Sequence, residues 1–294
     1  MKKIQIKLPI TAGNEEDLSR YIKKHHPSET SYKIVSRNVD ARGAAWGKTP
    51  YYVYDVLLGS ENILPLDSLV ASNKLKKEAP LIIGAGPAGL FCALYLVDHG
   101  VPVTLLERGS KASQRMLKIS QFWRKGIIDV DDNVCFGEGG AGLFSDGKLI
   151  TRVKSPYVKY VMQRLVEFGA PKEVEFVADP HVGSNKIRQI LTRLTSYLEE
   201  KGCHLHFNTR VEEFLLQGNV IEGVRTQKGQ TFYSPHVILA VGHSAENMYK
   251  ELEAKKVLMT AKDFAIGIRI EHPRKVIDAL QYGKQATSLC SLLG

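Results

Sequence analysis

Cysteine is scarce in this sequence, and long apolar runs are missing from it. Its 294 residues include four cysteines, and no two of them form a CxxC pair, which argues against both a disulfide framework and a cysteine-based metal site. No run approaches the roughly 18–20 apolar residues of a membrane-spanning helix, and residues 1–18 lack the apolar centre of a secretory signal. We therefore expect a cytoplasmic protein with no metal site and no membrane partner.

Acidic residues are outnumbered, but the imbalance is modest. The chain has 40 basic and 31 acidic residues, a net charge of +9, and the excess is spread along the whole length. A diffuse excess does not define a nucleic-acid surface, so nucleic acid is not favoured as a partner. With 44% apolar and 24% charged residues, the composition is that of a folded globular protein of one large or two modest domains.

Residues 1–79 are predicted to form a small α+β domain of βαββ order. Its helix is expected over residues 14–26, with Asn14 as the N-cap. Alternating apolar side chains predict the three strands at residues 4–8, 32–39 and 51–58. The polar stretch at residues 66–80 is the predicted domain boundary.

The sequence GAGPAG at residues 84–89 is the strongest motif of the chain. It follows a short apolar strand at residues 81–83 and opens a predicted helix at residues 87–99, which is the context of a dinucleotide-binding turn. The first glycine allows the tight turn, the second lets the backbone approach a pyrophosphate, and the third lets helix and strand pack closely. The cofactor-binding candidates in this motif are Gly84, Gly86, Pro87, Ala88 and Gly89.

An acidic residue ends the next predicted strand, at residues 101–107. Glu107 stands where a carboxylate would bind the hydroxyls of an adenosine ribose, and its charge argues against a ribose with a 2′-phosphate. The motif by itself does not distinguish FAD from NAD.

The remainder of residues 80–294 is predicted to complete an α/β domain. Further helices are predicted at residues 111–126, 155–169 and 184–201, and five short strands follow within residues 204–242. We expect a crossover strand, then an antiparallel meander, then a return strand. This order resembles that of the glutathione-reductase-like superfamily of flavoproteins with two dinucleotide-binding domains. The resemblance implies a Rossmann-like FAD-binding domain with an antiparallel β-meander, in which Val211 contacts the adenine and Gly242 ends the return strand near the cofactor.

Residues 136–149, FGEGGAGLFSDGKL, are too rich in glycine for a regular element. Such a loop can present successive N–H groups to an anion or to the edge of a flavin, and the alternative is a flexible surface loop. Its cofactor-binding candidates are Gly139, Gly140 and Gly142. The loop nearly matches a P-loop, but Leu149 replaces the magnesium-binding Ser or Thr, so nucleotide hydrolysis is not favoured.

Six basic residues follow Glu107 without an intervening acid. They are Arg108, Lys111, Arg115, Lys118, Arg124 and Lys125. Most runs of this kind form a solvated helix face. Arg115 is the exception that we single out, because an arginine soon after the ribose-binding acid could neutralise a cofactor phosphate; Arg108 is a second candidate.

Four segments resemble a bacterial family of predicted FAD-dependent dehydrogenases that carry a small N-terminal domain. They are residues 37–42, 136–149, 179–184 and 264–273. The resemblance implies an oxidoreductase that passes a hydride between a small-molecule substrate and FAD, with NAD(P)H as a candidate electron donor. Leu143 stands where the family usually has Thr, and Asn38-Val39 replaces part of its Ser-Ile-Asp-Ala-Arg pattern.

Only weak candidates exist for a catalytic group. The resemblance places Asp146 and Lys148 near the redox centre, and His181 lies between two turns, where it could serve as an acid or base or make a structural hydrogen bond. Cys135 has no second thiol close to it in sequence, so a disulfide-reductase mechanism is not favoured.

The end of the chain lacks a segment that enzymes of this architecture usually have. After residue 242 the sequence predicts a helix at residues 248–257, a strand at residues 264–270 and a helix at residues 273–283, but no late strand–Gly–Asp–helix segment. Family members are longer, so we expect a chain truncated at its C-terminus. The alternatives are a non-catalytic chain that binds a nucleotide cofactor and, less favoured, an RNA-associated flavoprotein.

Overall fold

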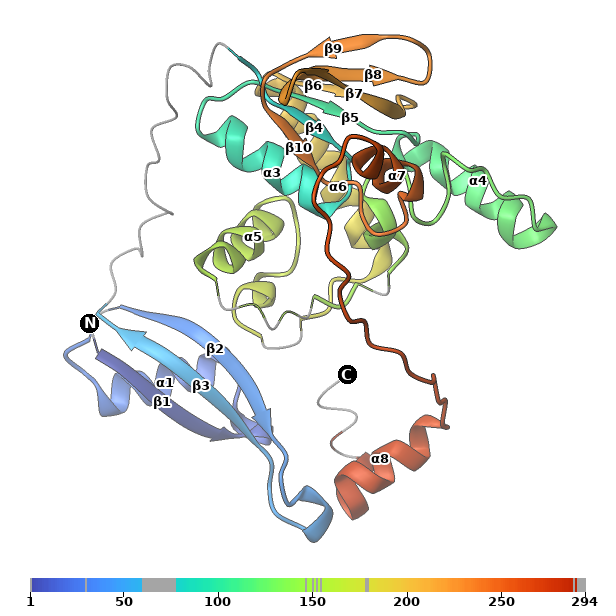
Figure 1. The fold of residues 1–294 in the computed structure, drawn as a ribbon. Helices are drawn as coiled ribbons and strands as arrows, with labels where there is room; N and C mark the ends of the chain where they lie inside the picture. The colour runs from blue at the N-terminus through green and yellow to red at the C-terminus, as the bar shows by residue number, and fades with distance from the viewer. Residues whose placement is uncertain are drawn as a thin grey trace. The chain divides into compact units, whose positions relative to one another are not determined.

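The computed structural model describes residues 2–29, 31–59, 78–145, 147–149, 151, 153, 155–177, 180–287 and 289 (Figure 1). They fall into two compact units, one drawn from residues 1–64, 175–180 and 262–294, the other from residues 65–174 and 181–261. The predicted boundary at residues 66–80 lies almost entirely outside the described residues, so a division at residue 79 stays a prediction. None of the helices in the described part of the chain has the length and apolarity that a membrane crossing requires.

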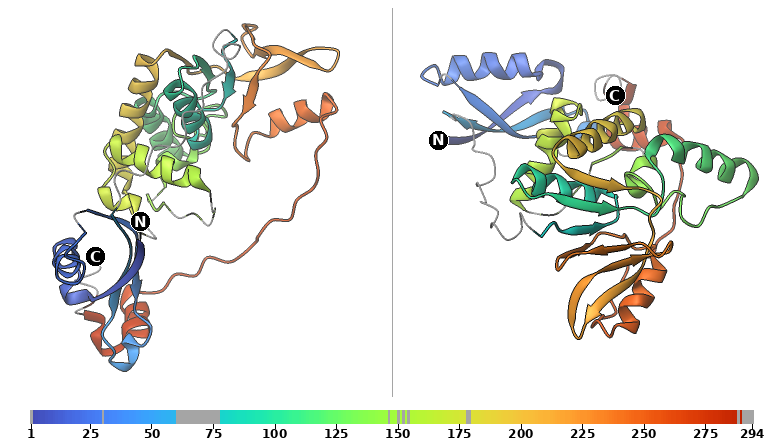
Figure 2. Two further views of the ribbon diagram at one scale, coloured as in Figure 1. Left: turned by 90° about the vertical axis from the view of Figure 1, so that its left-hand side faces the viewer. Right: turned by 90° about the horizontal axis from the view of Figure 1, so that it is seen from above.

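The first unit contains a three-stranded antiparallel sheet covered by a helix (Figure 2). Strand β3 (Tyr51–Leu58) lies between β1 (Lys2–Pro9) and β2 (Tyr32–Asp40). Helix α1 (Glu15–His25) connects β1 to β2. The predicted βαββ order is confirmed.

The core of the first unit forms where the helix meets the sheet. Leu18 and Ile22 of α1 are buried against the fully buried Tyr54 of β3. The Asn14 side chain accepts the N–H of Asp17, and the Asp17 carboxylate accepts the N–H of Asn14. This reciprocal capping box confirms the predicted N-cap.

Two segments from later in the chain complete the first unit. The N–H of Arg37 in β2 donates to the carbonyl oxygen of Phe176 over 2.7 Å, and the Arg37 guanidinium lies over the Phe176 ring. Helix α8 (Arg274–Tyr282) and the residues after it pack their apolar side chains on Ile10 and Ala44.

The second unit is built on a four-stranded parallel sheet. Its strand order is β10 (Val237–Leu239), β4 (Leu81–Ile83), β5 (Val103–Leu106) and β6 (Cys203–His206). The two central strands consist mostly of apolar residues that are buried on both faces, as is typical of a parallel sheet between two other layers.

Helices cover one face of the parallel sheet. Ile82 of β4 packs in one cluster with Leu94 of α3 (Pro87–Asp98) and Leu194 of α6 (Ser184–Glu200). Because side chains alternate along a strand, the neighbours of Ile82 face the opposite layer.

An antiparallel meander covers the opposite face (Figures 1 and 2). It runs in the order β7 (Val211–Gln217), β8 (Val220–Thr226) and β9 (Thr231–Tyr233). Phe214 of the meander packs with Leu106 of the parallel sheet. The three layers confirm the predicted α/β fold, a Rossmann-like domain with an antiparallel β-meander.

The segment before the last helix differs from the prediction. Between α7 (Glu246–Ala254) and α8, residues 264–270 form no strand. The alternating side chains of Phe264, Ile266, Ile268 and Ile270 are 71–91% exposed. The alternation alone predicted a strand, and that prediction was wrong because a strand also needs a neighbouring backbone to pair with, which this segment does not have among the described residues.

Candidate dinucleotide-binding site

The turn between β4 and α3 contains two glycines that the packing of the chain itself requires. A Cβ at Gly84 would lie 2.4 Å from the carbonyl oxygen of Ala240, and one at Gly89 would lie 1.9 Å from the carbonyl oxygen of Gly84. Gly84 also has a φ of 108°, which favours glycine. These two residues let β4, α3 and the segment after β10 approach one another.

Gly86 differs from these two glycines. Its φ of −73° and ψ of 179° are open to any residue. Among the described residues, an added Cβ would meet nothing nearer than the Cα of Gly140, at 4.0 Å. Gly86 is also the N-cap residue of α3, so the unpaired N–H groups of the first helical turn lie next to it. The space beside Gly86 is therefore not needed by the protein and is open to a ligand.

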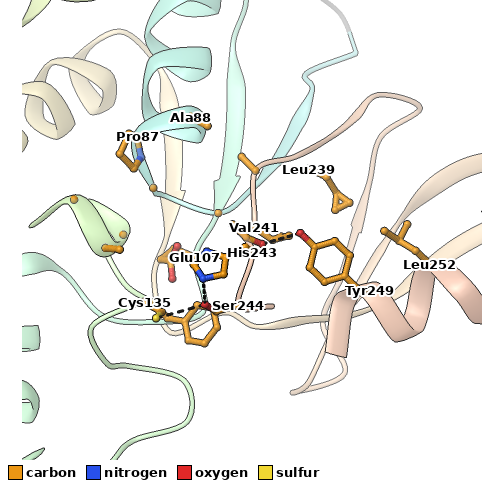
Figure 3. Close-up of a pocket in the computed structure, with 18 residues that line it drawn as sticks. Pro87, Ala88, Glu107, Cys135, Leu239, Val241, His243, Ser244, Tyr249 and Leu252 are labelled. Atoms are coloured by element: carbon orange, nitrogen blue, oxygen red, sulfur yellow. Dashed lines mark hydrogen bonds between the residues drawn. The ribbon is translucent and has the colours of Figure 1, made fainter. Parts of the chain in front are cut away.

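A cavity of about 590 Å³ lies in front of this turn (Figure 3). Its walls include the turn, Glu107, the glycine-rich loop, and the chain from the end of β10 into α7. A volume of this order suits a nucleotide-sized ligand. The sequence-predicted residues that line it are Gly84, Gly86, Pro87, Ala88, Glu107, Gly140, Gly142 and Gly242.

Glu107 is buried beside the cavity and holds three chain segments together. Its Oε1 accepts the N–H groups of Gly109 and Gly137, at 2.9 and 2.8 Å, and its Oε2 accepts the N–H of Ala85 at 2.7 Å. Because a carboxylate has about four acceptor positions, one position on Oε2 remains for a hydroxyl of the ligand. The carboxylate thus shapes the site and can still bind a sugar.

A smaller cavity of about 40 Å³ shares Gly84 and Glu107 with the first. Val211, at the start of the meander, and Arg108 line it. The Arg108 guanidinium pairs with Asp131 at 2.6 Å and lies over the ring of Phe136, 4.1 Å from its centroid. Glu107, the predicted sugar-binding residue, thus lines both the cavity at the glycine turn and the cavity at Val211.

The glycine-rich loop packs directly on the turn. The N–H of Gly139 donates to the carbonyl oxygen of Ala85 over 2.8 Å, and a Cβ on Gly140 would lie 3.1 Å from the Cα of Gly86. Gly139 itself faces Leu191 of α6 and does not line either cavity. Gly140 and Gly142, in a 3-10 turn, line the cavity next to the α3 N-terminus.

Arg115 lies in the protein interior, in α4 (Ala112–Lys125), and not in the cavity. Its side chain is 0% exposed, and its guanidinium donates to the carbonyl oxygens of Asn133, Val134, Glu138 and Gly140. Burial lowers the pKa of Arg115, and nearby carboxylates, Asp132 first, oppose that shift. The guanidinium therefore binds the main chain of residues 133–140 and does not line the cavity, so the predicted contact with a cofactor phosphate is not supported.

The weak catalytic candidates are not brought into the described cavities. Lys148 and His181 face each other as a single antiparallel bridge pair, and His181 is exposed. Asp146 lies outside the described residues. A catalytic role for any of the three stays a prediction.

Sequence reasoning missed three polar residues that follow the return strand. His243, Ser244 and Tyr249 line the cavity, and the Ser244 hydroxyl lies 3.3 Å from Nε2 of His243 and 3.6 Å from Sγ of Cys135 (Figure 3). Tyr249 donates to the carbonyl oxygen of Gly242 over 3.0 Å. Their position in the sequence could have indicated them, because residues that follow a return strand lie at the same sheet edge as the glycine turn. Within the described residues, no group of His, Cys, Asp and Glu side chains could hold a metal ion.

A search of known proteins found one curated relative that matches most of this chain. An uncharacterized protein of Clostridium beijerinckii is 33% identical over 264 residues, which is 85% of this chain and 49% of that protein. The chain therefore spans about half the length of the curated relative that it matches.

Solved structures with a similar fold include three from different organisms. They are the GidA-related protein from Thermus thermophilus (23% identity, 56% of this chain and 53% of that chain, TM-score 0.32), THI4 from Thermovibrio ammonificans (17%, 63% and 66%, 0.41) and L-proline dehydrogenase from P. horikoshii (16%, 60% and 56%, 0.34). At these identities and TM-scores they add nothing to the functional argument. Residues 82–133 match the family described as NAD(P)-binding Rossmann-like domain, in agreement with the parallel sheet and the glycine turn of the second unit.

Proposed function

We propose that the second unit binds FAD and that the chain belongs to a cytoplasmic FAD-dependent dehydrogenase, with a small-molecule substrate and NAD(P)H as a candidate electron donor. The observation that carries the proposal is Gly86. It lines the cavity at the N-terminus of a helix, and neither its backbone conformation nor its surroundings require glycine. A pyrophosphate can approach the backbone closely only where no side chain stands in its way, and a glycine at this position provides that space.

The residues around the cavity support an adenine dinucleotide in particular. The first turn of α3 offers unpaired N–H groups and the positive end of the helix dipole to the phosphates. Glu107 has one acceptor position left for a ribose hydroxyl, and its negative charge would repel a 2′-phosphate. Bound FAD would supply the hydride-accepting ring; the residues described here bind and orient the adenosine diphosphate half.

The choice of FAD over NAD rests on the meander and on the sequence resemblance. The antiparallel meander covers the face opposite α3, as the resemblance to the glutathione-reductase-like superfamily implies for an FAD domain. The glycine-rich loop at residues 136–149 and the segment at residues 37–42 support the dehydrogenase family. The chain spans about half the length of its curated relative. Binding of FAD and catalytic turnover by this chain are therefore tested separately.

The test is a titration of the purified chain with FAD, followed by its visible absorption spectrum, and a parallel titration with ADP and NAD⁺. We expect FAD and ADP to bind. Gly86→Ala should lower the affinity for both by roughly tenfold or more, because its methyl group occupies the space that the pyrophosphate needs. Gly267→Ala is the matched control, since an added Cβ there meets nothing within 4 Å.

Two outcomes would contradict the proposal. If the wild-type chain binds neither FAD nor ADP, the cavity does not hold an adenine dinucleotide. If NAD⁺ binds more tightly than FAD, the cofactor assignment is wrong although the Rossmann-like site is retained. Bound FAD that neither a chemical reductant nor NAD(P)H reduces would favour a non-catalytic, cofactor-binding chain.

A further inference from the structure

Arg115 is a buried cation to which the proposed function assigns no role. It is the largest of the fully buried side chains in the described part of the molecule. Taking a guanidinium out of water is costly unless its donors are satisfied, and four of its contacts are to main-chain carbonyl oxygens within eight residues of one loop. Such an arrangement fixes the course of the loop.

The neighbouring carboxylates hold the same loop from other directions. Glu107 accepts the N–H of Gly137, and the Glu138 side chain accepts the N–H of Ala112 at the start of α4. Asp132 lies 3.8 Å from Nε of Arg115 and offsets its charge. The side chains that hold residues 132–140 therefore include one buried cation and three buried carboxylates.

The loop position matters because Gly140 forms one wall of the cavity. Arg115 Nη1 donates to the Gly140 carbonyl oxygen over 3.0 Å. The Cα of that same residue lies 4.0 Å from the point where a Cβ of Gly86 would be. The position of the cavity wall next to the α3 N-terminus thus depends on where Arg115 holds Gly140.

We propose that Arg115 is a positioning residue that sets the affinity for an adenine dinucleotide by holding residues 133–140 against the glycine turn, without touching the ligand. This inference rests on the proposed function. Lysine cannot replace arginine here. The planar guanidinium donates to these carbonyl groups from two separate nitrogens, whereas the single nitrogen of lysine cannot reach all of them.

The experiment compares Arg115→Lys and Arg115→Met with the wild type in titrations with ADP and with adenosine. We expect the affinity for ADP to fall roughly tenfold in Arg115→Lys and further in Arg115→Met, as for the loss of one or more hydrogen bonds. The affinity for adenosine, which lacks the phosphates that would bind at the α3 N-terminus, should change far less. Arg124→Met is the matched control, because Arg124 lies in the same helix and is exposed.

Hydrogen exchange of the unliganded chain supplies a second readout. The amides of residues 133–142 should exchange faster in Arg115→Lys than in the wild type, with the parallel sheet unchanged. If Arg115→Met does not fold, Arg115→Lys and its exchange pattern decide the question.

The possible failures are distinguishable. The inference is overturned if the wild type binds ADP and folded Arg115→Lys binds it equally well, or if ADP and adenosine lose affinity by the same factor. A wild-type chain that binds neither FAD nor ADP would instead refute the proposed function, and this inference with it.

Discussion

Gly84, Gly86 and Gly89 belong to one sequence motif, but each lacks a side chain for its own reason. Gly84 needs a positive φ and close contact with the carbonyl group of Ala240, and Gly89 packs against Gly84 itself. Gly86 has ordinary dihedral angles and open space beside it. Two of the three glycines therefore serve folding and one is available for binding.

This division predicts that Gly86 and Gly89 respond differently to replacement by alanine. Gly89→Ala should lower the free energy of unfolding by about 1–3 kcal/mol or more, because the new methyl group must displace the backbone of the turn. Gly86→Ala should change it by less than about 0.5 kcal/mol. Thermal and urea unfolding of the two variants measure the difference. Equal stability of Gly89→Ala and the wild type would contradict the packing described here.

His206 predicts a dependence of stability on pH. Burial, assisted by His204, lowers the pKa of His206 below its ordinary value of 6.5. The unfolded chain therefore binds a proton near about pH 6.5 while the folded chain does not. Stability should fall as the pH is lowered through that value, until the folded state is protonated as well. His206→Gln should weaken the dependence between about pH 7.5 and 5.5 in urea unfolding, whereas His272→Gln, at an exposed site, should not.

At the scale of elements, three helices on one face of the sheet meet at a single carboxylate. Asp98 ends α3 and accepts the hydroxyl groups of Tyr160, in α5 (Pro156–Glu167), and of Tyr197, in α6, each at 2.8 Å. Burial and the Asp98 carboxylate raise the pKa of Tyr160, so its hydroxyl stays a donor at ordinary pH. Arg164 of α5 adds an ion pair at 3.5 Å.

Removing either hydroxyl should loosen this junction. We expect Tyr160→Phe and Tyr197→Phe each to lower the free energy of unfolding by about 0.5–1 kcal/mol, and Asp98→Ala by about 2 kcal/mol, because it removes the acceptor of both. The combined Tyr160→Phe/Tyr197→Phe variant should lose about the sum of the two single changes. Tyr233→Phe, on a side chain that is 75% exposed, is the control. A loss equal to that of the control would mean that the hydrogen bonds do not stabilise the helices.

Local patterns predicted most of these elements, and the exceptions have a physical cause. The capped helix after Asn14, the strand–glycine–helix unit at residues 81–98 and the meander all follow from short-range periodicity and turn residues. The strand expected at residues 264–270 failed because pairing depends on a second segment, which a local pattern does not contain.

The sequence also predicted part of the candidate site, namely the residues that belong to a local motif. Gly86 and Glu107 carry a motif with fixed spacing, so their positions beside the cavity followed from sequence. Arg115 was predicted to contact a cofactor phosphate, but its side chain is buried in the protein. The spacing of charged residues in a sequence does not reveal such burial. Ser244 and its neighbours were missed, since only the three-dimensional return of the chain brings them to the turn.

For the molecule as a whole, the order of the parallel strands determines where a ligand can bind. The chain passes from β4 outward to β5 and β6 and then returns to β10 on the other side of β4. The carboxyl ends of β4 and β10 therefore border a crevice at the point where the strand order reverses. Gly84 and Ala240 follow these two strands directly, and both line the cavity. The topology and the glycine motif thus indicate the same site independently.

The segment between α7 and α8 gives the last prediction. Residues 257–273 contain no helix or strand (Figure 1), and the side chains of Leu258 and Phe264 are 90% and 82% exposed. A protease requires an extended, accessible backbone, and such segments are cut before packed elements open. Brief chymotrypsin treatment should therefore cleave first at these two residues, while Phe214, which is buried in the meander, stays intact.

Mass spectrometry of the fragments identifies the cut. Combining Leu258→Ser with Phe264→Ser should slow the first cleavage without changing the thermal unfolding of the second unit, because neither side chain packs in its core. If chymotrypsin instead cuts this segment no faster than the buried sites, its backbone is covered in solution. The alternating Phe264, Ile266, Ile268 and Ile270 would then pair as the strand that their pattern predicts, and faster hydrogen exchange of these amides after dilution of the protein would show that a second copy provides the partner.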